Sequence, residues 1–179
     1  GISSHTTVFL TGIPKFDKYS DEYNSSNRVE HIGICTNRLD PIDKAEKVVK
    51  LICDIDATID LWLRPHPADN RRKVWRKLSD DYGVAFSNPE KDESFAFLDK
   101  VDAMIAGQSG IHLEACLMNV IPISFDFSNM GGDRYEFDKF GLTKTVEDTE
   151  GLKKIIKQYT VVRPDVRSNA KRYCETIDT

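Results

Sequence analysis

The sequence predicts an α/β domain with a mainly parallel sheet and helices on both of its faces. Strand-like and helix-like segments alternate along most of the 179 residues. The strand-like segments are short apolar runs, such as HIGIC (31–35), and the segments between them carry apolar residues at spacings of three and four. Repeated strand–helix units of this kind are typical of parallel sheets that are covered on both sides.

The segment 40–63 decides where the second strand of this series begins. Asp40 precedes Pro41, a pair that suits the N-cap and the first position of a helix. Apolar residues then recur with a helical period, at Ala45, Val48, Val49, Ile52 and Ile55. We therefore predict a helix that ends near Ile55 and a strand at 58–63, so that the sequence Arg-Pro-His-Pro stands at the carboxyl end of that strand.

The other predicted elements continue the alternation along the chain. They are strands at 7–10, 31–35, 84–86, 103–106 and 120–124, and helices at 69–82, 93–100, 111–118, 148–159 and 165–174. The polar stretch DEYNSSNR separates the first strand from the others. We interpret residues 1–27 as a linker with one leading strand, and residues 28–179 as the folded domain.

Composition excludes several classes of protein. The net charge of −4 and the pI of 5.6 argue against a nucleic-acid-binding surface, which needs clustered Lys and Arg. No apolar run approaches the ~20 residues that cross a bilayer. The four cysteines form no CxxC pair, so we expect free thiols in a reducing cytoplasm, three of them in the core, and no bound metal.

Three turns follow predicted strands, and ligands of open α/β sheets bind at that edge. In the first turn two prolines hold His66 beside Arg64, an arrangement that suits a phosphate oxygen. The alternative is a loop whose histidine bonds only to nearby backbone. Arg38 follows the strand 31–35, where it either neutralises a diphosphate or points into solvent.

The third turn is AGQSGIHLEA (106–115), in which a strand runs into small residues and a helix start. The small residues of this turn, such as Ser109 and Gly110 after Gln108, allow close approach of a ligand, and free N–H groups of a first helical turn attract anions. Glu114 stands where a carboxylate reaches ribose hydroxyls. The alternatives are that Ser109 is a plain N-cap and that Glu114 is a solvated surface residue.

Taken together, these segments resemble the C-terminal half of GT-B glycosyltransferases, especially enzymes of bacterial capsule and surface polysaccharide synthesis. VFLTGIPKFDKY is similar to the segment that leaves the N-terminal domain, RPHP to the Lys/Arg-x-His-Pro loop, and VDAMIAGQSGIHLEACLMNVIPISF to the block with a Ser-rich turn and Glu-Ala helix. Two positions depart from the pattern: Asn119 stands where glycine is common, and Gln108 where an acidic or hydroxyl residue is usual.

The resemblance implies a Rossmann-like sheet, one half of a GT-B fold, that holds a nucleotide-activated sugar as its donor. It further implies phosphate contacts from Arg38, Arg64, His66 and the 108–110 turn, ribose contact from Glu114, and a catalytic role for His66. No metal or other cofactor is expected. The implied partners are the donor and an N-terminal acceptor-binding domain absent from these residues, with a peripheral membrane contact through the parent enzyme. We expect the isolated chain to be inactive.

Two other enzyme classes remain open. A UDP-N-acetylglucosamine 2-epimerase shares the same half-domain pattern. A magnesium-dependent phosphohydrolase of the haloacid dehalogenase type would use Asp54 and Asp56 of DIDAT, with a second acidic loop at Asp133 and Asp138. The hydrolase requires a strand before Asp54, whereas the spacing there predicts a helix. A receiver or flavodoxin-like module is disfavoured because HIGICTNR lacks the required acidic or Ser/Thr-rich turn.

Overall fold

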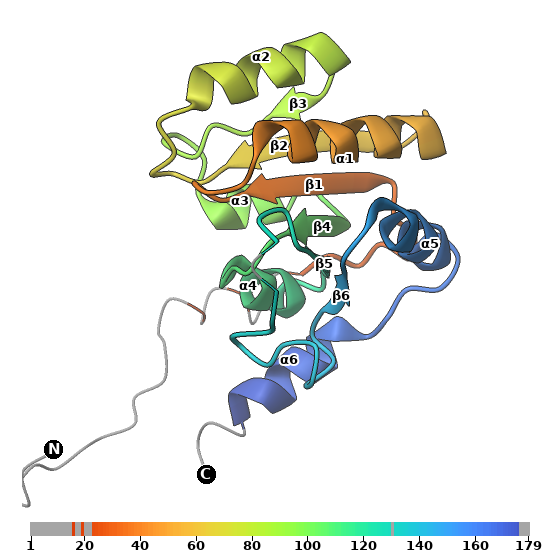
Figure 1. The fold of residues 1–179 in the computed structure, drawn as a ribbon. Coiled ribbons are helices and arrows are strands. Elements are labelled where there is room, and N and C mark those ends of the chain that lie inside the picture. Colours follow the sequence, from red (N-terminus) through yellow and green to blue (C-terminus); the bar gives the residue numbers. More distant parts are fainter. Residues whose placement is uncertain (1–15, 17–18, 20–22, 130, 176–179) are drawn as a thin grey trace, which may run out of the picture.

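The computed structural model describes Phe16, Tyr19 and residues 23–129 and 131–175. A six-stranded sheet with the order β3-β2-β1-β4-β5-β6 forms the centre of the molecule, and every neighbouring pair of strands is parallel (Figure 1). The strands are β1 (His31–Thr36), β2 (Asp60–Pro65), β3 (Ala85–Phe86), β4 (Ala103–Ala106), β5 (Ile121–Phe125) and β6 (Lys144–Val146). The predicted parallel α/β sheet is therefore confirmed. The strand predicted at 7–10 lies outside the described residues.

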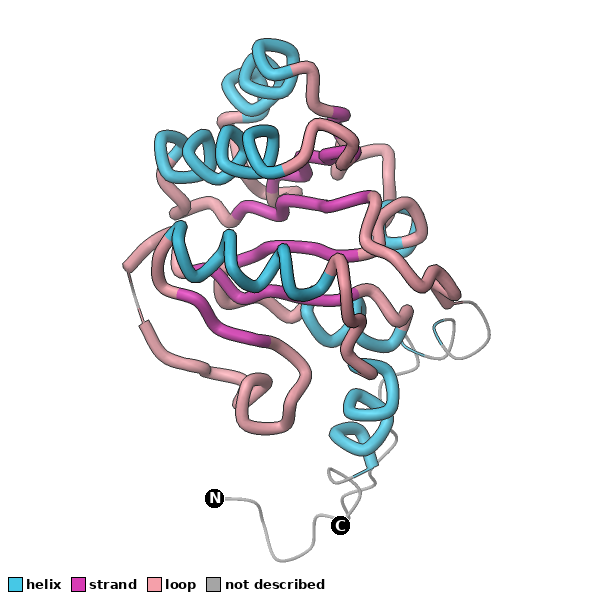
Figure 2. The backbone as a smooth tube through the Cα atoms, turned by 90° about the vertical axis from the view of Figure 1, so that its right-hand side faces the viewer, coloured by secondary structure: helices cyan, strands magenta, loops and turns pink. Residues whose placement is uncertain are grey.

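Helices cover both faces of the sheet. In Figure 2 the strands (magenta) run through the middle of the molecule and the helices (cyan) lie around them. One apolar cluster joins one face of the sheet to α1 (Ile42–Ile55), α2 (Arg72–Tyr82) and α5 (Thr149–Tyr159). A second cluster joins the other face to α3 (Ser94–Leu98) and α4 (Ile111–Leu117), and α6 (Val166–Glu175) packs on α4. Burial on both sides explains why β1, β4 and β5 read as continuous apolar runs.

The strand order reverses between β1 and β4, which pair with each other at the centre of the sheet. The chain leaves β1 toward one edge of the sheet and later leaves β4 toward the other. The loops that follow these two strands consequently diverge and leave a crevice at the carboxyl edge. All of the turns that the sequence analysis singled out lie at this edge.

Three predicted details differ from the structure. The strand predicted at 58–63 begins at Asp60 and ends at Pro65, because the Asp56 carboxylate binds the backbone N–H of Thr58 (2.8 Å) and holds that residue in a turn. Arg64 thus belongs to the strand. Helix α1 is capped by Pro41 with no side-chain bond, so Asp40 is not its N-cap. Strand β6 was not predicted at all.

The cysteine prediction is partly wrong. All four thiols are free, but only Cys35 and Cys116 are buried, while Cys53 is exposed and Cys174 is intermediate. Cys53 lies in α1 about 90° around the helix from the centre of the buried stripe, so the helical period places it at the edge of that stripe and not within it. Among the described helices, none combines the length and the apolar character needed to span a bilayer.

The residue type is constrained at two positions, by lack of space at Gly33 and by the backbone conformation at Asn119. A Cβ on Gly33 of β1 would lie 2.5 Å from Cζ of Phe97, whose ring is fully buried. Asn119 follows α4 with φ of +60°, a conformation that favours glycine but that asparagine tolerates. Its Nδ2 donates to the carbonyl of Asn24 (2.7 Å), so the asparagine meets the backbone requirement and adds a contact that glycine lacks.

Replacement of Gly33 by alanine should destabilise the domain by about 1–3 kcal/mol, because the new methyl group overlaps a ring that packs against the sheet. The matched control is Gly110→Ala, where a Cβ meets nothing within 4 Å and φ is −63°. That variant should lie within about 0.5 kcal/mol of the original protein. Urea unfolding followed by circular dichroism measures both, and equal stabilities would contradict the packing account.

Candidate functional site

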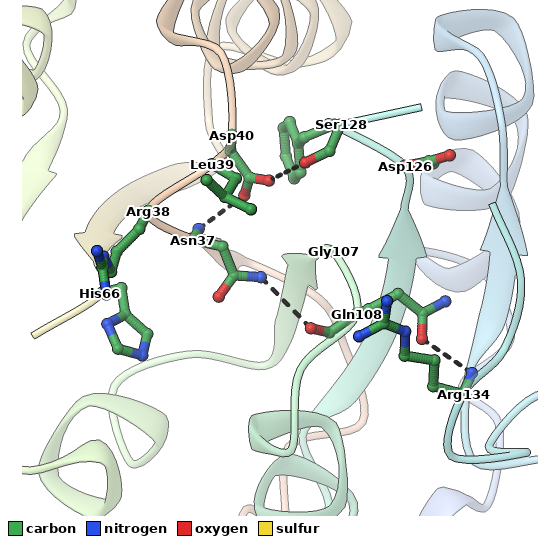
Figure 3. Close-up of a pocket in the computed structure, with 11 residues that line it drawn as sticks. Asn37, Arg38, Leu39, Asp40, His66, Gly107, Gln108, Asp126, Ser128 and Arg134 are labelled. Atoms are coloured by element: carbon green, nitrogen blue, oxygen red, sulfur yellow. Dashed lines mark hydrogen bonds between the residues drawn. The ribbon is translucent and has the colours of Figure 1, made fainter. Parts of the chain in front are cut away.

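Two adjoining hollows open at the carboxyl edge of the sheet, beside the point where the strand order reverses. The larger encloses 410 Å³ and the smaller 290 Å³, and Asn37 and His66 line both of them. The larger hollow is formed by residues after β1, β2, β4 and β5 (Figure 3). The two hollows together have the size of a ligand-binding crevice, and we refer to them as the crevice.

The crevice brings together every residue that the sequence analysis predicted as a ligand contact. Arg38, His66 and Gln108 line the larger hollow. The smaller hollow is lined by Arg64, His66, Ser109, Gly110 and Glu114. These residues come from three separate loops, the end of β2 and helix α4, so their convergence is a result of the strand order. Whether they contact a ligand stays a prediction.

An arginine in the β2–α2 loop fixes the β1–α1 loop that carries Arg38. Arg71 donates from Nη1 to the carbonyl of Asp40 (2.9 Å) and from Nη2 to the carbonyls of Asn37 (3.2 Å) and Arg38 (2.8 Å). The same guanidinium forms a fork on Asp69, with Nε–Oδ1 at 3.0 Å and Nη2–Oδ2 at 2.7 Å. We call this arrangement the Asp69–Arg71 clamp. It joins the loop before α1 to the loop before α2 at the rim of the crevice.

The clamp is neutralised internally. Asp69 is 1% exposed, and its Oδ2 also accepts from the indole N–H of Trp75 (3.0 Å). Burial acts to raise the pKa of Asp69, but the hydrogen bonds from Arg71 and Trp75 outweigh it and lower the pKa to about 2. The Asp69 carboxylate therefore stays charged at neutral pH and balances Arg71, so the clamp adds no net charge beside Arg38 and His66.

His66 is oriented by its own loop. Its Nδ1 accepts from the backbone N–H of Ala68 (3.0 Å), so in the neutral ring the proton resides on Nε2. Figure 3 shows Arg38 beside His66 at one end of the larger hollow. Both side chains are exposed, and neither the Arg38 guanidinium nor His66 Nε2 has a hydrogen-bond or ion-pair partner among the described residues. A donor and a cation thus face the same space without a counter-charge.

Arg64 lines the smaller hollow and also holds the β3–α3 loop through hydrogen bonds. It is 6% exposed, and its two Nη atoms donate to Ser87 Oγ (2.7 Å) and to the carbonyl of Asp92 (2.8 Å). The guanidinium also lies over the ring of Phe97, 5.4 Å from its centroid. Burial lowers the pKa of Arg64. These bonds hold the β3–α3 loop against the sheet, a role that the sequence pattern did not reveal.

Glu114 is buried rather than solvated, which excludes the surface alternative. It is 7% exposed, and its Oε2 accepts from Ser94 Oγ (2.6 Å) and from the Tyr19 hydroxyl (2.9 Å). Burial raises the pKa of Tyr19, and the neighbouring carboxylate adds to that effect, so the phenol remains a donor. Tyr19 belongs to the segment 1–27 that we interpreted as a linker, and its hydroxyl binds Glu114, a residue that lines the smaller hollow.

Ser109 and His112 shape the turn between β4 and α4. Gly110 is the N-cap of α4 with no side-chain bond, and Ser109 Oγ lies 3.5 Å from the N–H of Ile111. His112 is buried, and burial lowers its pKa to about 4, so the ring is neutral. Its Nε2 donates to the carbonyl of Gly107 (2.8 Å), because a carbonyl oxygen only accepts. This bond fixes the turn that presents Gln108.

Several crevice residues were missed by the sequence analysis. Asp40 is 2% exposed and accepts from the N–H of Asn37 (2.7 Å) and from Ser128 Oγ (2.8 Å), which links the β1–α1 loop to the loop after β5. Burial raises the pKa of Asp40. Asn37 Nδ2 donates to the carbonyl of Gln108 (3.4 Å). The signal that was available for these residues is their position just after predicted strands.

The carboxylates of the hydrolase hypothesis do not meet. Asp54 and Asp56 lie at the end of α1, at the amino edge of the sheet, and Asp133 lies in the loop after β5. The oxygens of Asp133 accept from the N–H groups of Phe137 (2.9 Å) and Asp138 (2.8 Å). No group of three or more His, Cys, Asp or Glu side chains in the described part of the chain could hold a metal ion. A catalytic site built on Asp54 is therefore wrong.

Comparison with known proteins supports this fold assignment. No family model and no curated protein matches the sequence. The C-terminal domain of LpcC, a glycosyl transferase group 1 family protein from Francisella tularensis, is similar in structure with a TM-score of 0.58. The two are 11% identical over 89% of this chain and 96% of that one. The chain has the fold of the C-terminal half of a GT-B glycosyltransferase.

Two larger enzymes contain the same GT-B half. A mutant of S. aureus TarM, solved with fondaparinux, α-GlcNAc-glycerol and UDP, matches with a TM-score of 0.59 and 12% identity over 88% of this chain. The UDP-GlcNAc 2-epimerase of Neisseria meningitidis, bound to UDP-GlcNAc, matches with a TM-score of 0.56 and 17% identity over 85%. The chain spans 34% of the former and 44% of the latter.

Removal of the charge at Asp69 should destabilise the protein in a pH-dependent way. The pKa of Asp69 is lowered by folding from about 3.9 to about 2. Its stabilisation is complete above the unfolded pKa and is lost as the pH falls toward the folded pKa. At pH 7, Asp69→Asn should cost about 2 kcal/mol of unfolding free energy, and the difference should shrink between about pH 4 and pH 2.

The control for this prediction is Asp81→Asn. Asp81 is an exposed ion-pair partner of Lys77, and both residues lie in α2. It should cost less than about 0.5 kcal/mol. Denaturant unfolding from pH 2 to pH 8 measures all three proteins. A constant difference between wild type and Asp69→Asn across that range would show that the clamp does not depend on the ionised carboxylate.

Proposed function

We propose that this domain binds the nucleotide-sugar donor of a glycosyltransferase that acts in bacterial surface polysaccharide synthesis. The observation that carries the proposal is the group of unpaired donors at the switch point of the sheet. Arg38 and His66 Nε2 line the larger hollow at the end next to the smaller one, and neither forms an ion pair or side-chain hydrogen bond among the described residues. Such a group favours a diphosphate, since ionised oxygens form the stronger hydrogen bonds with cationic donors.

The carboxylates near the crevice are bound by other groups of the protein. Asp69 is paired with Arg71 in the clamp, Asp40 accepts two hydrogen bonds, and Asp126, which lines the larger hollow, accepts from the N–H of Gly131 (2.8 Å). Glu114, in the smaller hollow, is held by Ser94 and faces the 109–110 turn. We place the diphosphate next to Arg38 and His66, and the ribose next to Glu114, whose carboxylate accepts hydrogen bonds from hydroxyl groups.

One further group in the smaller hollow is an argument for binding of a polar ligand. Thr36, the last residue of β1, is 3% exposed, and its Oγ1 has no hydrogen-bond partner among the described residues. Thr36 lines the same hollow as Ser109 and Gly110. A buried hydroxyl without a partner is uncommon in proteins, and a ligand hydroxyl or phosphate oxygen would satisfy it.

The chemical role that we assign to the crevice is stabilisation of the leaving nucleotide. When the sugar leaves, negative charge grows on the phosphate oxygen that it was bonded to. The clamp fixes the backbone of Arg38 and the Ala68 bond orients the His66 ring, so the guanidinium and the Nε2–H start close to the oxygen on which this charge grows. His66 is the residue that we propose as catalytic in this sense. The acceptor and any general base are assigned to a further domain of the parent enzyme.

We take UDP as the nucleotide, because the TarM and epimerase structures that resemble this chain contain UDP and UDP-GlcNAc, respectively. In calorimetric titration, UDP should bind more tightly than UMP, CMP or CDP. Arg38→Ala and His66→Ala should each weaken UDP binding about tenfold, the effect of one charged hydrogen bond. The matched control is Arg28→Ala, an exposed arginine before β1 at the other edge of the sheet.

The control should bind UDP with unchanged affinity. Circular dichroism confirms that each variant is folded before it is titrated. If wild type does not bind UDP, or if Arg28→Ala and Arg38→Ala weaken binding equally, the crevice is not the nucleotide site. With the complete parent enzyme, a glycosylated acceptor distinguishes transfer from epimerisation, which changes the sugar and needs no acceptor.

A further inference from the structure

Arg134 stands apart from the other cations of the crevice. Figure 3 shows its side chain next to Gln108, at the end of the larger hollow that is opposite Arg38 and His66. It comes from the loop after β5, whereas Arg38 and His66 come from the loops after β1 and β2. The larger hollow therefore has a cationic group at each end, with the neutral amides of Asn37 and Gln108 between them.

The backbone of Arg134 is held in position by Gln108. The side-chain amide of Gln108 donates from Nε2 to the carbonyl of Gly132 and accepts at Oε1 from the N–H of Arg134 (3.1 Å). The amide places a donor and an acceptor on two separate atoms, whereas an ionised acidic side chain has no donor and a hydroxyl has both functions on a single atom. Gly131 and Gly132 both have positive φ (61° and 83°), which the turn requires.

The guanidinium of Arg134 has no hydrogen-bond or ion-pair partner in the described part of the chain, although two carboxylates belong to the same loop. Asp126 Oδ2 accepts from the N–H of Gly131 (2.8 Å), and Asp133 accepts from the N–H groups of Phe137 and Asp138. Backbone donors thus bind Oδ2 of Asp126 and both oxygens of Asp133, and Asp126 also lines the larger hollow. The result is an arginine with a fixed backbone, a free planar fork and an open hollow in front of it.

We propose that Arg134 binds a carboxylate on the donor sugar, so that the donor is a nucleotide-activated acidic sugar. The inference rests on the proposed function, which places the diphosphate at the Arg38–His66 end. The sugar that follows the diphosphate then extends through the hollow toward the opposite end. A guanidinium there matches the geometry of a carboxylate with two parallel hydrogen bonds, and a neutral sugar would leave it unpaired.

The test uses three ligands that share one nucleotide: UDP, UDP-glucose and UDP-glucuronate. Wild type should bind UDP-glucuronate about tenfold more tightly than UDP-glucose in calorimetric titrations. Arg134→Ala should bind both nucleotide sugars equally, and its affinity for UDP should stay within about twofold of wild type. Arg134→Lys, which keeps the charge but not the fork, should retain only part of the preference.

Each other outcome has a definite meaning. Equal affinity of wild type for the two nucleotide sugars overturns the acidic-sugar inference and leaves the proposed function intact. Weaker binding of all three ligands by Arg134→Ala also overturns it, because Arg134 would then contact the nucleotide. A preference for UDP-glucuronate that persists in Arg134→Ala assigns the effect to the extra charge and refutes the contact. Failure of wild type to bind UDP overturns the proposed function itself.

Discussion

The crevice depends on the Asp69–Arg71 clamp more than on any other interaction. Loops that follow neighbouring parallel strands have no ladder of hydrogen bonds to hold them, and the β1–α1 loop turns away from β2 as it enters α1. Arg71 reaches across this gap to three carbonyls of the 37–40 segment, and Asp69 supplies the charge that allows an arginine to be held there. The positions of Arg38 and His66 at one end of the crevice follow from this bridge.

The other loops around the larger hollow are joined to the clamped loop by hydrogen bonds from side chains. Asp40 connects the clamped loop to Ser128 after β5, and Asn37 connects it to the carbonyl of Gln108 after β4. Gln108 in turn holds the loop that carries Arg134. A continuous set of hydrogen bonds thus runs around the larger hollow, and its cationic side chains remain available. The guanidinium groups of Arg38 and Arg134, which line this hollow, form no ion pair among the described residues.

Sequence reasoning succeeded where burial of one face of an element gives a periodic spacing of apolar residues. The spacing from Ala45 to Ile55 reflects one helical face against the sheet, and it placed Asp54 and Asp56 away from the crevice and His66 at its edge. It failed where a contact joins distant segments through backbone atoms. Nothing in the residues around Arg71, Gln108 or Tyr19 indicates which carbonyl or carboxylate they reach, because such bonds leave no periodic pattern. Strand β6, three residues long at the sheet edge, is too short to show alternation.

The central claim is that the carboxyl edge beside the β1–β4 reversal receives the nucleotide diphosphate. Titration of ¹⁵N-labelled protein with UDP, followed by amide chemical shifts, tests it most directly. If the diphosphate binds at this edge, shift changes should be concentrated in the loops 36–40, 66–71 and 107–111, with none at 54–60 on the opposite edge of the sheet. Changes confined to the 54–60 segment, or shifts scattered over the surface without saturation, would contradict it.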